Sequence, residues 1–252
     1  MKKSSWNLGI LFGDRWVVKT KASGLFCVAF LALCLSHQMA LAQLDQETIR
    51  FIEDVLIGTE YGSQGEPQVC YRWETRPRLS TFGDGSHHPT VVQKTVAHIN
   101  EFLPDNRRIE ILPSEDLTAT IQLHFVPLKE FETLAEAEGF EVSGSDWGVF
   151  YMRWNRFHEI ESAVVLIAED KLRGRRLQHF LLEELTQSLG MAGDSTRFKE
   201  SVFYEDGGQR QFGTATELSE LDRKLIRFLY QHVPAGTSPV ELGVFLERYW
   251  QQ

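Results

Sequence analysis

The pattern of hydrophobic and polar positions predicts alternating helices and strands after residue 42. Apolar residues spaced three and four apart predict amphipathic helices, and alternating or continuous apolar runs predict strands. Helices are expected in residues 43–62, 88–104, 128–139, 175–190, 214–233 and 238–250, and the third of these is either a polar helix or a lid. Strands are expected in residues 67–83, 108–112, 118–127, 147–155 and 161–170. This order predicts a single α/β (α+β) domain with a mixed sheet and no internal linker.

The first 42 residues have the pattern of an export signal. A basic start leads into an apolar run of 12 residues, Gly24 to Leu35, and Ala40-Leu41-Ala42 follow as a small-x-small cleavage site. A spanning helix needs about 20 apolar residues. We therefore predict a cleaved signal peptide at 1–42 and a mature domain at 43–252, in the periplasm or secreted. The alternative is an uncleaved segment that anchors a membrane-tethered accessory subunit.

The net charge of the mature domain argues against two classes of partner, and its cysteine content bears on its stability. Residues 1–42 hold five of the 26 basic and one of the 35 acidic residues, so residues 43–252 carry a net charge of −13. This charge argues against nucleic acid or anionic lipid as a partner.

Two of the three cysteines also lie in residues 1–42, and Cys70 alone follows. The mature domain therefore has no internal disulfide and depends on its hydrophobic core.

The helix predicted for 175–190 carries a carboxylate in its apolar face. Leu177, Leu181, Leu185 and Leu189 recur every four residues, and Leu182 widens this apolar arc. Glu184 falls inside the arc, and Glu183 and Gln187 follow its polar border. A carboxylate at such a position is either paired or has a raised pKa. These three residues are therefore candidate site residues.

The same helix has the spacing of the metalloprotease motif H-E-x-x-H-x-x-G. In that motif two histidines hold Zn²⁺, and the glutamate activates water. Here Glu183 and Gln187 occupy the histidine positions, and Glu184 and Gly190 occupy the glutamate and glycine positions. Glutamine is a poor zinc ligand, so the sequence predicts no metal. A structural helix with one buried, hydrogen-bonded carboxylate explains the same spacing.

Segments after this helix resemble the corresponding parts of metzincins. Gly193-Asp194 fall near the position of a third metal ligand. The segment SVFYED, 201–206, resembles the Met-turn with Phe203 in place of the methionine, and 217–230 resembles the matrixin segment that runs from L-x-x-x-D to L-Y. Together with Gly190, these features follow one another in the expected order. The resemblance implies a zincin-like domain with an active-site-type helix, a Met-turn-like turn and C-terminal helices.

Residues 175–240 are also similar to an uncharacterised family of exported bacterial proteins, some described as candidate lipoproteins. That family has the signature E-L-T-Q-x-L-G-L-x-x-D, and residues 43–170 match it in broad pattern, which gives a family core of about 65–235. The signature positions here are Glu183, Glu184, Gln187, Gly190 and Asp194. That family has no assigned activity, so the resemblance does not indicate which activity, if any, this chain has.

Two hypotheses of function follow. In the first, the chain is an exported, metzincin-like domain that has lost the zinc-binding histidines and acts as a non-catalytic binding or scaffolding module of the cell envelope. Glu183, Gln187 and Asp194 then hydrogen-bond one another in place of a metal. The partner is an extended peptide or an envelope protein along residues 148–154, with no nucleic acid and no small-molecule cofactor. In the second, the chain is a peptidase or cell-wall hydrolase with Glu184 as general acid or base and Glu183 or Asp194 as the second carboxylate.

Several other polar and aromatic residues have simple structural interpretations. His87 and His88 are interpreted as a solvated loop, since adjacent histidines at a helix start do not both face one metal. His179 is interpreted as an exposed i,i+4 partner of Glu183, although a carboxylate–imidazole site with Glu183 and Asp194 stays open.

Cys70 is expected to be a small buried hydrophobe. The aromatic residues of the 147–155 strand, Trp147, Phe150, Tyr151 and Trp154, are either core or a substrate shelf. The sequence has no G-x-S-x-G motif, phosphate loop or dinucleotide fingerprint.

Overall fold

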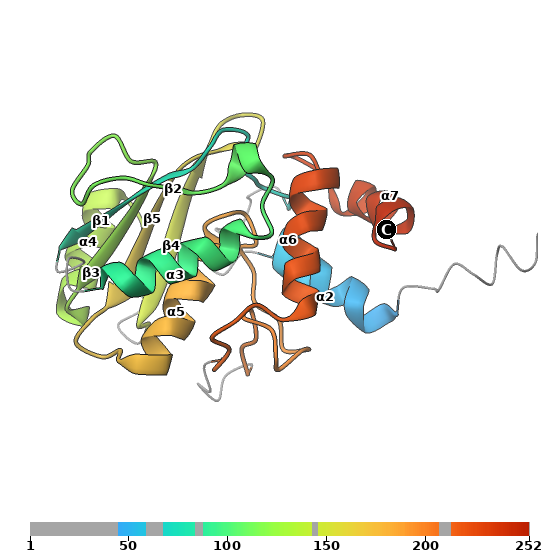
Figure 1. The fold of residues 1–252 in the computed structure, drawn as a ribbon. Coiled ribbons are helices and arrows are strands. Elements are labelled where there is room, and N and C mark those ends of the chain that lie inside the picture. The colour runs from blue at the N-terminus through green and yellow to red at the C-terminus, as the bar shows by residue number, and fades with distance from the viewer. Residues whose placement is uncertain (1–44, 59–67, 84–87, 143–145, 207–212, 252) are drawn as a thin grey trace, which may run out of the picture. The chain divides into compact units, whose positions relative to one another are not determined.

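The computed structural model describes residues 45–58, 68–83, 88–142, 146–206 and 213–251 (Figure 1). These residues belong to one compact unit, Leu44–Gln252. The signal peptide predicted at 1–42 lies outside the described residues. Within the described part of the chain, no helix combines the length and the apolar character needed to cross a membrane.

Five strands form one mixed sheet in the order β2-β1-β3-β5-β4. Their bounds are β1 Arg78–Gly83, β2 Glu110–Ile111, β3 Ile121–Val126, β4 Gly148–Trp154 and β5 Ile160–Ala168. Neighbouring pairs among β2, β1, β3 and β5 are parallel, whereas β4 runs antiparallel to β5 and forms one edge of the sheet. The predicted α/β class with a mixed sheet is confirmed.

Helices cover both faces of this sheet. The helices are α2 Gln46–Ile57, α3 Pro89–Asn100, α4 Phe131–Glu138, α5 Gly174–Gln187, α6 Glu220–His232 and α7 Pro239–Tyr249, with 3-10 turns η2 Asp105–Arg107 and η3 Leu128–Glu130. Buried side chains of α3 and α5 join the main core, whereas Phe131 of α4 packs with Val149 of β4 and Leu166 of β5 in a second cluster (Figure 1). The central strand β5 is therefore covered on both sides, as its continuous apolar run predicts.

The strand predicted for 67–83 forms only in its second half. Residues 68–77 instead run past the ends of helices, where Cys70 N donates to Thr237 O (2.9 Å) and Trp73 Nε1 donates to Ser188 O (3.0 Å). The first bond uses a backbone donor that a regular strand would direct to a neighbouring strand. The helix predicted for 214–233 is also shorter than expected, because the capping box of Ser219 and Asp222 begins α6 at Glu220.

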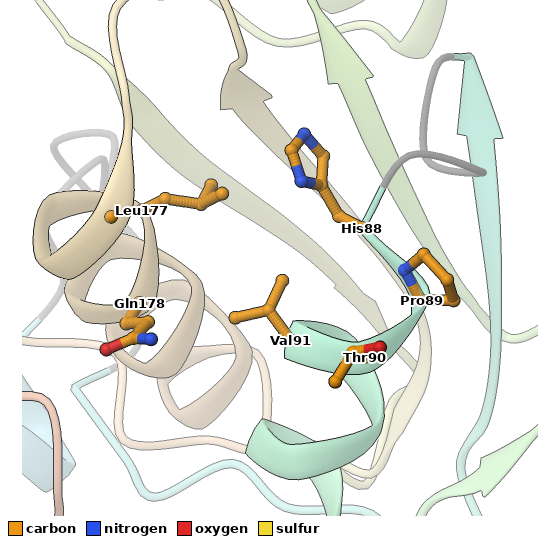
Figure 2. A pocket seen from close by; sticks show the side chains of 7 residues that line it. His88, Pro89, Thr90, Val91, Leu177 and Gln178 are labelled. Atoms are coloured by element: carbon orange, nitrogen blue, oxygen red, sulfur yellow. The ribbon is translucent and has the colours of Figure 1, made fainter.

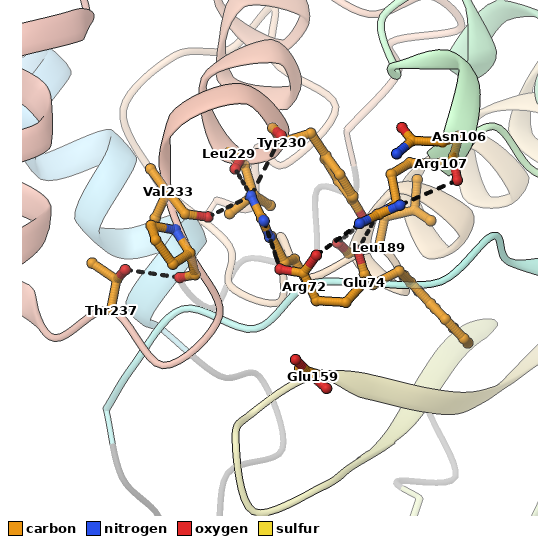
Figure 3. Close-up of polar contacts among 12 residues, drawn as sticks. Arg72, Glu74, Asn106, Arg107, Glu159, Leu189, Leu229, Tyr230, Val233 and Thr237 are labelled. Carbon is orange, nitrogen blue, oxygen red and sulfur yellow. Dashed lines mark hydrogen bonds and ion pairs between the residues drawn. The ribbon is translucent and has the colours of Figure 1, made fainter.

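A polar network holds the 72–74 segment against the end of α6 (Figure 3). Arg72 Nη1 donates to the carbonyls of Leu229 (3.1 Å), in the last turn of that helix, and of Val233 (2.9 Å), its C-cap residue. Glu74 accepts from Arg72 Nε (2.7 Å) and from Arg107 Nη2 (2.8 Å). Burial alone would raise the pKa of Glu74, but the hydrogen bonds from the two arginines lower it overall. The guanidinium of Arg72 thus gives a donor to the carbonyl of Val233, the C-cap residue of α6, and a second donor to the carbonyl of Leu229, which also accepts from Val233 N (3.2 Å).

Candidate functional site

The polar residues of α5 are buried more deeply than a polar helix border would be. Glu184 is 4% exposed, Gln187 1% and His179 1%. The Glu183 side chain is 13% exposed. Leu181 and Leu185, from the leucine arc, are fully buried on the neighbouring face, as predicted. Other parts of the chain therefore cover these polar side chains and shield them from solvent.

All four predicted site residues line one narrow pocket between α5 and the start of β4. The pocket has a volume of about 60 Å³. Its lining residues are Asp146, Trp147, Gly148, Phe180, Glu183, Glu184, Gln187, Asp194, Tyr204, Glu205 and Gly213. The structure therefore brings Glu183, Glu184, Gln187 and Asp194 together, beside the edge strand of the sheet.

Gly148 brings β4 close to the Glu184 carboxylate. A Cβ atom at residue 148 would lie 2.5 Å from Glu184 Oε1 and 2.8 Å from Phe180 Cδ1. Any larger residue would displace one of these side chains. Sequence reasoning missed Gly148, and the available signal was a glycine inside a strand of bulky residues, which often marks a close approach.

Gln187 links α5 to the turn that follows it. Its Nε2 donates to Asp194 Oδ1 at 3.0 Å, and we call this hydrogen bond the helix–turn link. Its Oε1 is buried and accepts no hydrogen bond from the described residues. The amide therefore has one hydrogen-bonded side and one acceptor that has no donor among the described residues.

Hydrogen bonds to Asp222 of α6 hold the turn at 195–204 in place. This buried carboxylate accepts from Ser201 Oγ (2.6 Å) and Val202 N (3.1 Å), as well as from Ser219 N (2.8 Å). Burial raises the pKa of Asp222, and its hydrogen bonds partly oppose this shift. Phe203, which the sequence predicts to take the place of the Met-turn methionine, is fully buried. The aspartate of the predicted L-x-x-x-D segment thus joins α6 to the predicted turn.

Gly190 ends the helix region in a conformation that favours glycine. Its φ angle is +102°. A Cβ atom there would lie 2.1 Å from Tyr71 O. Tyr230 Oη donates to the neighbouring carbonyl of Leu189 at 2.9 Å. The chain after α5 is therefore held by close backbone contact with the 70–74 segment and by a side chain from α6.

The interpretation of His179 as an exposed residue is wrong. Its Nδ1 lies 2.8 Å from Ala215 O, and its Nε2 lies 3.3 Å from Glu183 Oε2 without hydrogen-bond geometry. A Cβ atom at Gly213 would lie 2.6 Å from the ring. The 213–215 segment therefore buries the histidine, which the helical pattern does not reveal.

We expect the burial of His179 to make stability pH-dependent. Burial lowers the pKa of His179, and the hydrogen bond to Ala215 O only partly opposes this. The unfolded chain binds the proton at an ordinary pKa of about 6.5, and the folded chain binds it at lower pH. This contribution is therefore complete above about pH 6.5 and is lost as the pH falls below it, by at most about 1.4 kcal/mol per pH unit.

Denaturant unfolding between pH 5 and pH 7.5 measures this effect. His179→Asn keeps a donor for Ala215 O but removes the titrating ring, so its stability should fall less on acidification. A gain in wild-type stability between pH 7 and pH 6 would contradict the prediction, because it would mean that the Glu183 carboxylate stabilises the charged ring.

His88 also differs from the expected solvated loop. It lies at the N-cap of α3, and its partly buried ring is 5.0 Å from the Phe125 ring, centroid to centroid. Figure 2 shows it facing a pocket of about 270 Å³ together with Val91 and Leu177. Packing against the sheet explains this burial. His87 lies outside the described residues.

The remaining candidates divide between core and pocket. Cys70 is fully buried, as predicted, and burial raises the pKa of its thiol to about 12. Phe150 is a core residue, Tyr151 stacks on Phe140, and Trp154 packs on Tyr71. Among the four aromatic residues of this strand region, Trp147 alone lines the pocket at α5.

The donor groups of the pocket do not fit a zinc centre of the zincin type. Such a centre uses imidazole nitrogens at the positions held here by Glu183 and Gln187. The amide donor of Gln187 is directed at Asp194, so this side chain already forms the helix–turn link. In the described ranges, no three His, Cys, Asp or Glu side chains are arranged to hold a metal ion.

Residues 45–247 match the family described as "Protein of unknown function (DUF2927)". The chain belongs to the DUF2927 family. The prediction of an uncharacterised family is thereby confirmed, whereas the E-L-T-Q-x-L-G-L-x-x-D signature and the lipoprotein character stay predictions. No curated protein matches the chain.

The DUF2927 domain is also similar to two solved structures of myroilysin. One is 11% identical and covers 64% of this chain and 82% of that chain, with a TM-score of 0.36. The other is 12% identical and covers 71% of this chain and 95% of that chain, again with a TM-score of 0.36. These values carry no information about activity.

Proposed function

We propose that this DUF2927 domain is a non-catalytic binding module of the cell envelope. In this proposal the helix–turn link between Gln187 and Asp194 takes the structural place of a metal, and an extended peptide or envelope protein binds along β4 and the pocket at α5. The single observation that carries the proposal is the Gln187–Asp194 hydrogen bond of 3.0 Å. This bond joins α5 to the turn that follows it. In this proposal, Gln187 and Asp194 are therefore engaged with each other and do not hold a metal or a substrate.

The position of the pocket supports a peptide partner. β4 lies at the edge of the sheet, and the pocket opens beside its first residue, Gly148. An extended peptide binds such an edge through main-chain hydrogen bonds and places side chains in adjacent pockets.

A panel of capped peptides tests this proposal. Acetyl-Ala-Val-X-Val-Ala-amide, with X as Lys, Leu, Glu or Ser, is added while amide hydrogen exchange is measured. We expect at least one member to slow exchange within residues 148–154. The opposite edge strand, β2, is the internal control and should exchange at an unchanged rate. Equal slowing at both edges, or no slowing at β4 with any member, would overturn the proposal.

A hydrolase is the second candidate, and the burial of Glu184 in the pocket favours it. This carboxylate is 4% exposed and has its Oε1 over Gly148, beside the strand where a peptide would lie. Under this alternative, Glu184→Gln abolishes hydrolysis of a peptide or cell-wall substrate and leaves the melting temperature nearly unchanged. Strong destabilisation without any activity to lose would instead mark Glu184 as structural.

Export is part of the proposal. It rests on the basic start, the short apolar run and the Ala40-Leu41-Ala42 site of the N-terminal segment. Mass spectrometry of the mature protein should give Gln43 as its first residue. A retained N-terminal segment would replace the free module with a membrane-tethered one.

A further inference from the structure

Two arginines of α6 lie over one aromatic ring just beyond the end of α3. Arg223 Cζ is 5.5 Å and Arg227 Cζ is 4.9 Å from the centroid of the Phe102 ring. Cation–π contacts of this kind fix the position of a guanidinium without using its N–H donors. We call Phe102, Arg223 and Arg227 the double-arginine cluster.

Most N–H donors of the cluster are not used by the protein. Arg223 Nε donates to Leu218 O at 2.8 Å, which is the one hydrogen bond of this side chain within the described residues. Arg227 is exposed and forms no hydrogen bond or ion pair with the part of the chain that the structure describes. Because a guanidinium carries five N–H donors, both side chains keep donors for a ligand.

The charge of the cluster also has no carboxylate partner among the described residues. Like charges four residues apart on a helix repel each other. Of the neighbouring carboxylates, Glu101 lies 4.0 Å from His98 Nδ1, and buried Asp222 accepts hydrogen bonds from the turn at 195–204. Glu220, in the first turn of α6, forms no ion pair with a described residue. The two positive charges of the cluster are therefore open to an anion from outside the chain.

The spacing of the two arginines suits one small anion. Side chains four residues apart are neighbours on one face of a helix, with Cβ atoms about 5–6 Å apart. Both guanidiniums also lie within 5.5 Å of the same ring centroid, so one group can contact both. A guanidinium binds carboxylate and phosphate oxygens through paired N–H donors. Two guanidiniums therefore match a group with two negative charges.

The acidic character of the chain limits the size of this anion. The net charge of −13 on residues 43–252 repels an extended polyanion. Salt, however, screens exposed charges beyond about 8 Å at physiological ionic strength. A compact anion at the cluster therefore interacts mainly with the two guanidiniums.

We infer that the double-arginine cluster binds a compact dianionic group with carboxylate or phosphate oxygens. Arg223 and Arg227 donate N–H groups to its oxygens, and the Phe102 ring holds the two guanidiniums in position. The inference goes beyond the proposed function, because no residue of the cluster lines the pocket at α5. It does not depend on a peptide at β4.

NMR titration of the Arg223 and Arg227 side-chain signals, at pH 7.5 and physiological ionic strength, tests this inference. The probes are inorganic phosphate and acetyl-Glu-Glu-amide, and the controls are acetate and acetyl-Gln-Gln-amide. We expect saturable shifts at both arginines with at least one probe and much weaker effects of the controls. A response to phosphate alone identifies a phosphate group as the ligand, and a response to acetyl-Glu-Glu-amide alone identifies an acidic peptide. No saturable shift with either probe, or equal affinity for a control, would overturn the inference.

Substitutions of Arg227 separate paired hydrogen bonding from charge. Arg227→Lys keeps the charge and loses the planar set of donors, so the affinity should fall by at least about tenfold. Arg227→Gln should abolish saturable binding. Because Arg227 is exposed, both variants should keep the wild-type melting temperature. If Arg227→Lys binds as tightly as the wild type, charge alone attracts the anion and the inference fails.

Arg156 provides the matched control. It is also an exposed arginine over an aromatic ring, with its Cζ 4.6 Å from the centroid of the Phe157 ring, but no second described arginine lies over that ring. Arg156→Gln removes the same charge as Arg227→Gln and should leave the affinity unchanged. An equal loss of affinity in the two variants would contradict the inference, because the net charge of the protein would then control binding.

Discussion

Gly190→Ala should prevent the domain from folding stably. Residue 190 has a φ of +102°, where an L side chain is strained, and the added Cβ atom would lie 2.1 Å from the backbone oxygen of Tyr71. Neither the carbonyl nor the helix end can move easily, because Tyr71 is buried and Leu189 O accepts from Tyr230. We expect a loss of more than about 4 kcal/mol in the free energy of unfolding, measured by denaturant titration.

Gly174→Ala is the matched control for this prediction. Gly174, at the start of the same helix, also has a positive φ, +55°, but no atom lies within 4 Å of its added Cβ. It should lose only about 1 kcal/mol, from backbone strain alone. Similar losses for the two variants would mean that the contact between residue 190 and Tyr71 contributes nothing.

Asp222→Ala should have the second largest effect. The buried carboxylate accepts hydrogen bonds from Ser201 Oγ, Val202 N and Ser219 N, at 2.6 to 3.1 Å. Its removal leaves these donors without an acceptor inside the protein, which costs about 1–3 kcal/mol for each buried group. We expect the free energy of unfolding to fall by at least about 3 kcal/mol, together with faster amide exchange in residues 195–204.

The control for Asp222 is a carboxylate at the same helical position in another capping box. Glu241 caps α7 by accepting from Ser238 N at 2.9 Å, but it is exposed, and within the described residues its carboxylate bonds to Ser238 alone. Glu241→Ala should therefore destabilise the protein much less. If the two variants lose similar stability, helix capping alone explains Asp222, and its contacts with the turn add nothing.

Local patterns predict the elements of this fold well because each has one dominant period. β3 places Ile121, Leu123 and Phe125 in the core and leaves Gln122 and His124 partly exposed, as its alternation predicts. The 68–77 segment was predicted as a strand because it alternates in the same way. Its partners, however, are helix ends far along the chain, such as Leu229 and Val233, and no local pattern encodes them.

The helical pattern predicts where the candidate residues lie on α5, but it does not predict how other segments enclose them. The helical period places Glu184 in the apolar face, and the structure finds it 4% exposed there. The pocket also depends on Gly148 from β4 and Tyr204 from the turn, and Gly213 encloses His179. These residues meet only through tertiary packing, so a helical wheel assigns His179 to the exposed surface.

Metal content measures the central claim most directly. Protein purified without chelators is analysed for bound zinc by mass spectrometry, and its melting temperature is recorded with and without EDTA. We predict less than stoichiometric zinc and an unchanged melting temperature with EDTA, while Asp194→Ala, which breaks the helix–turn link, lowers the melting temperature in both conditions. Stoichiometric zinc that Gln187→Ala removes would contradict the account, because Gln187 would then be a metal ligand and not the partner of Asp194.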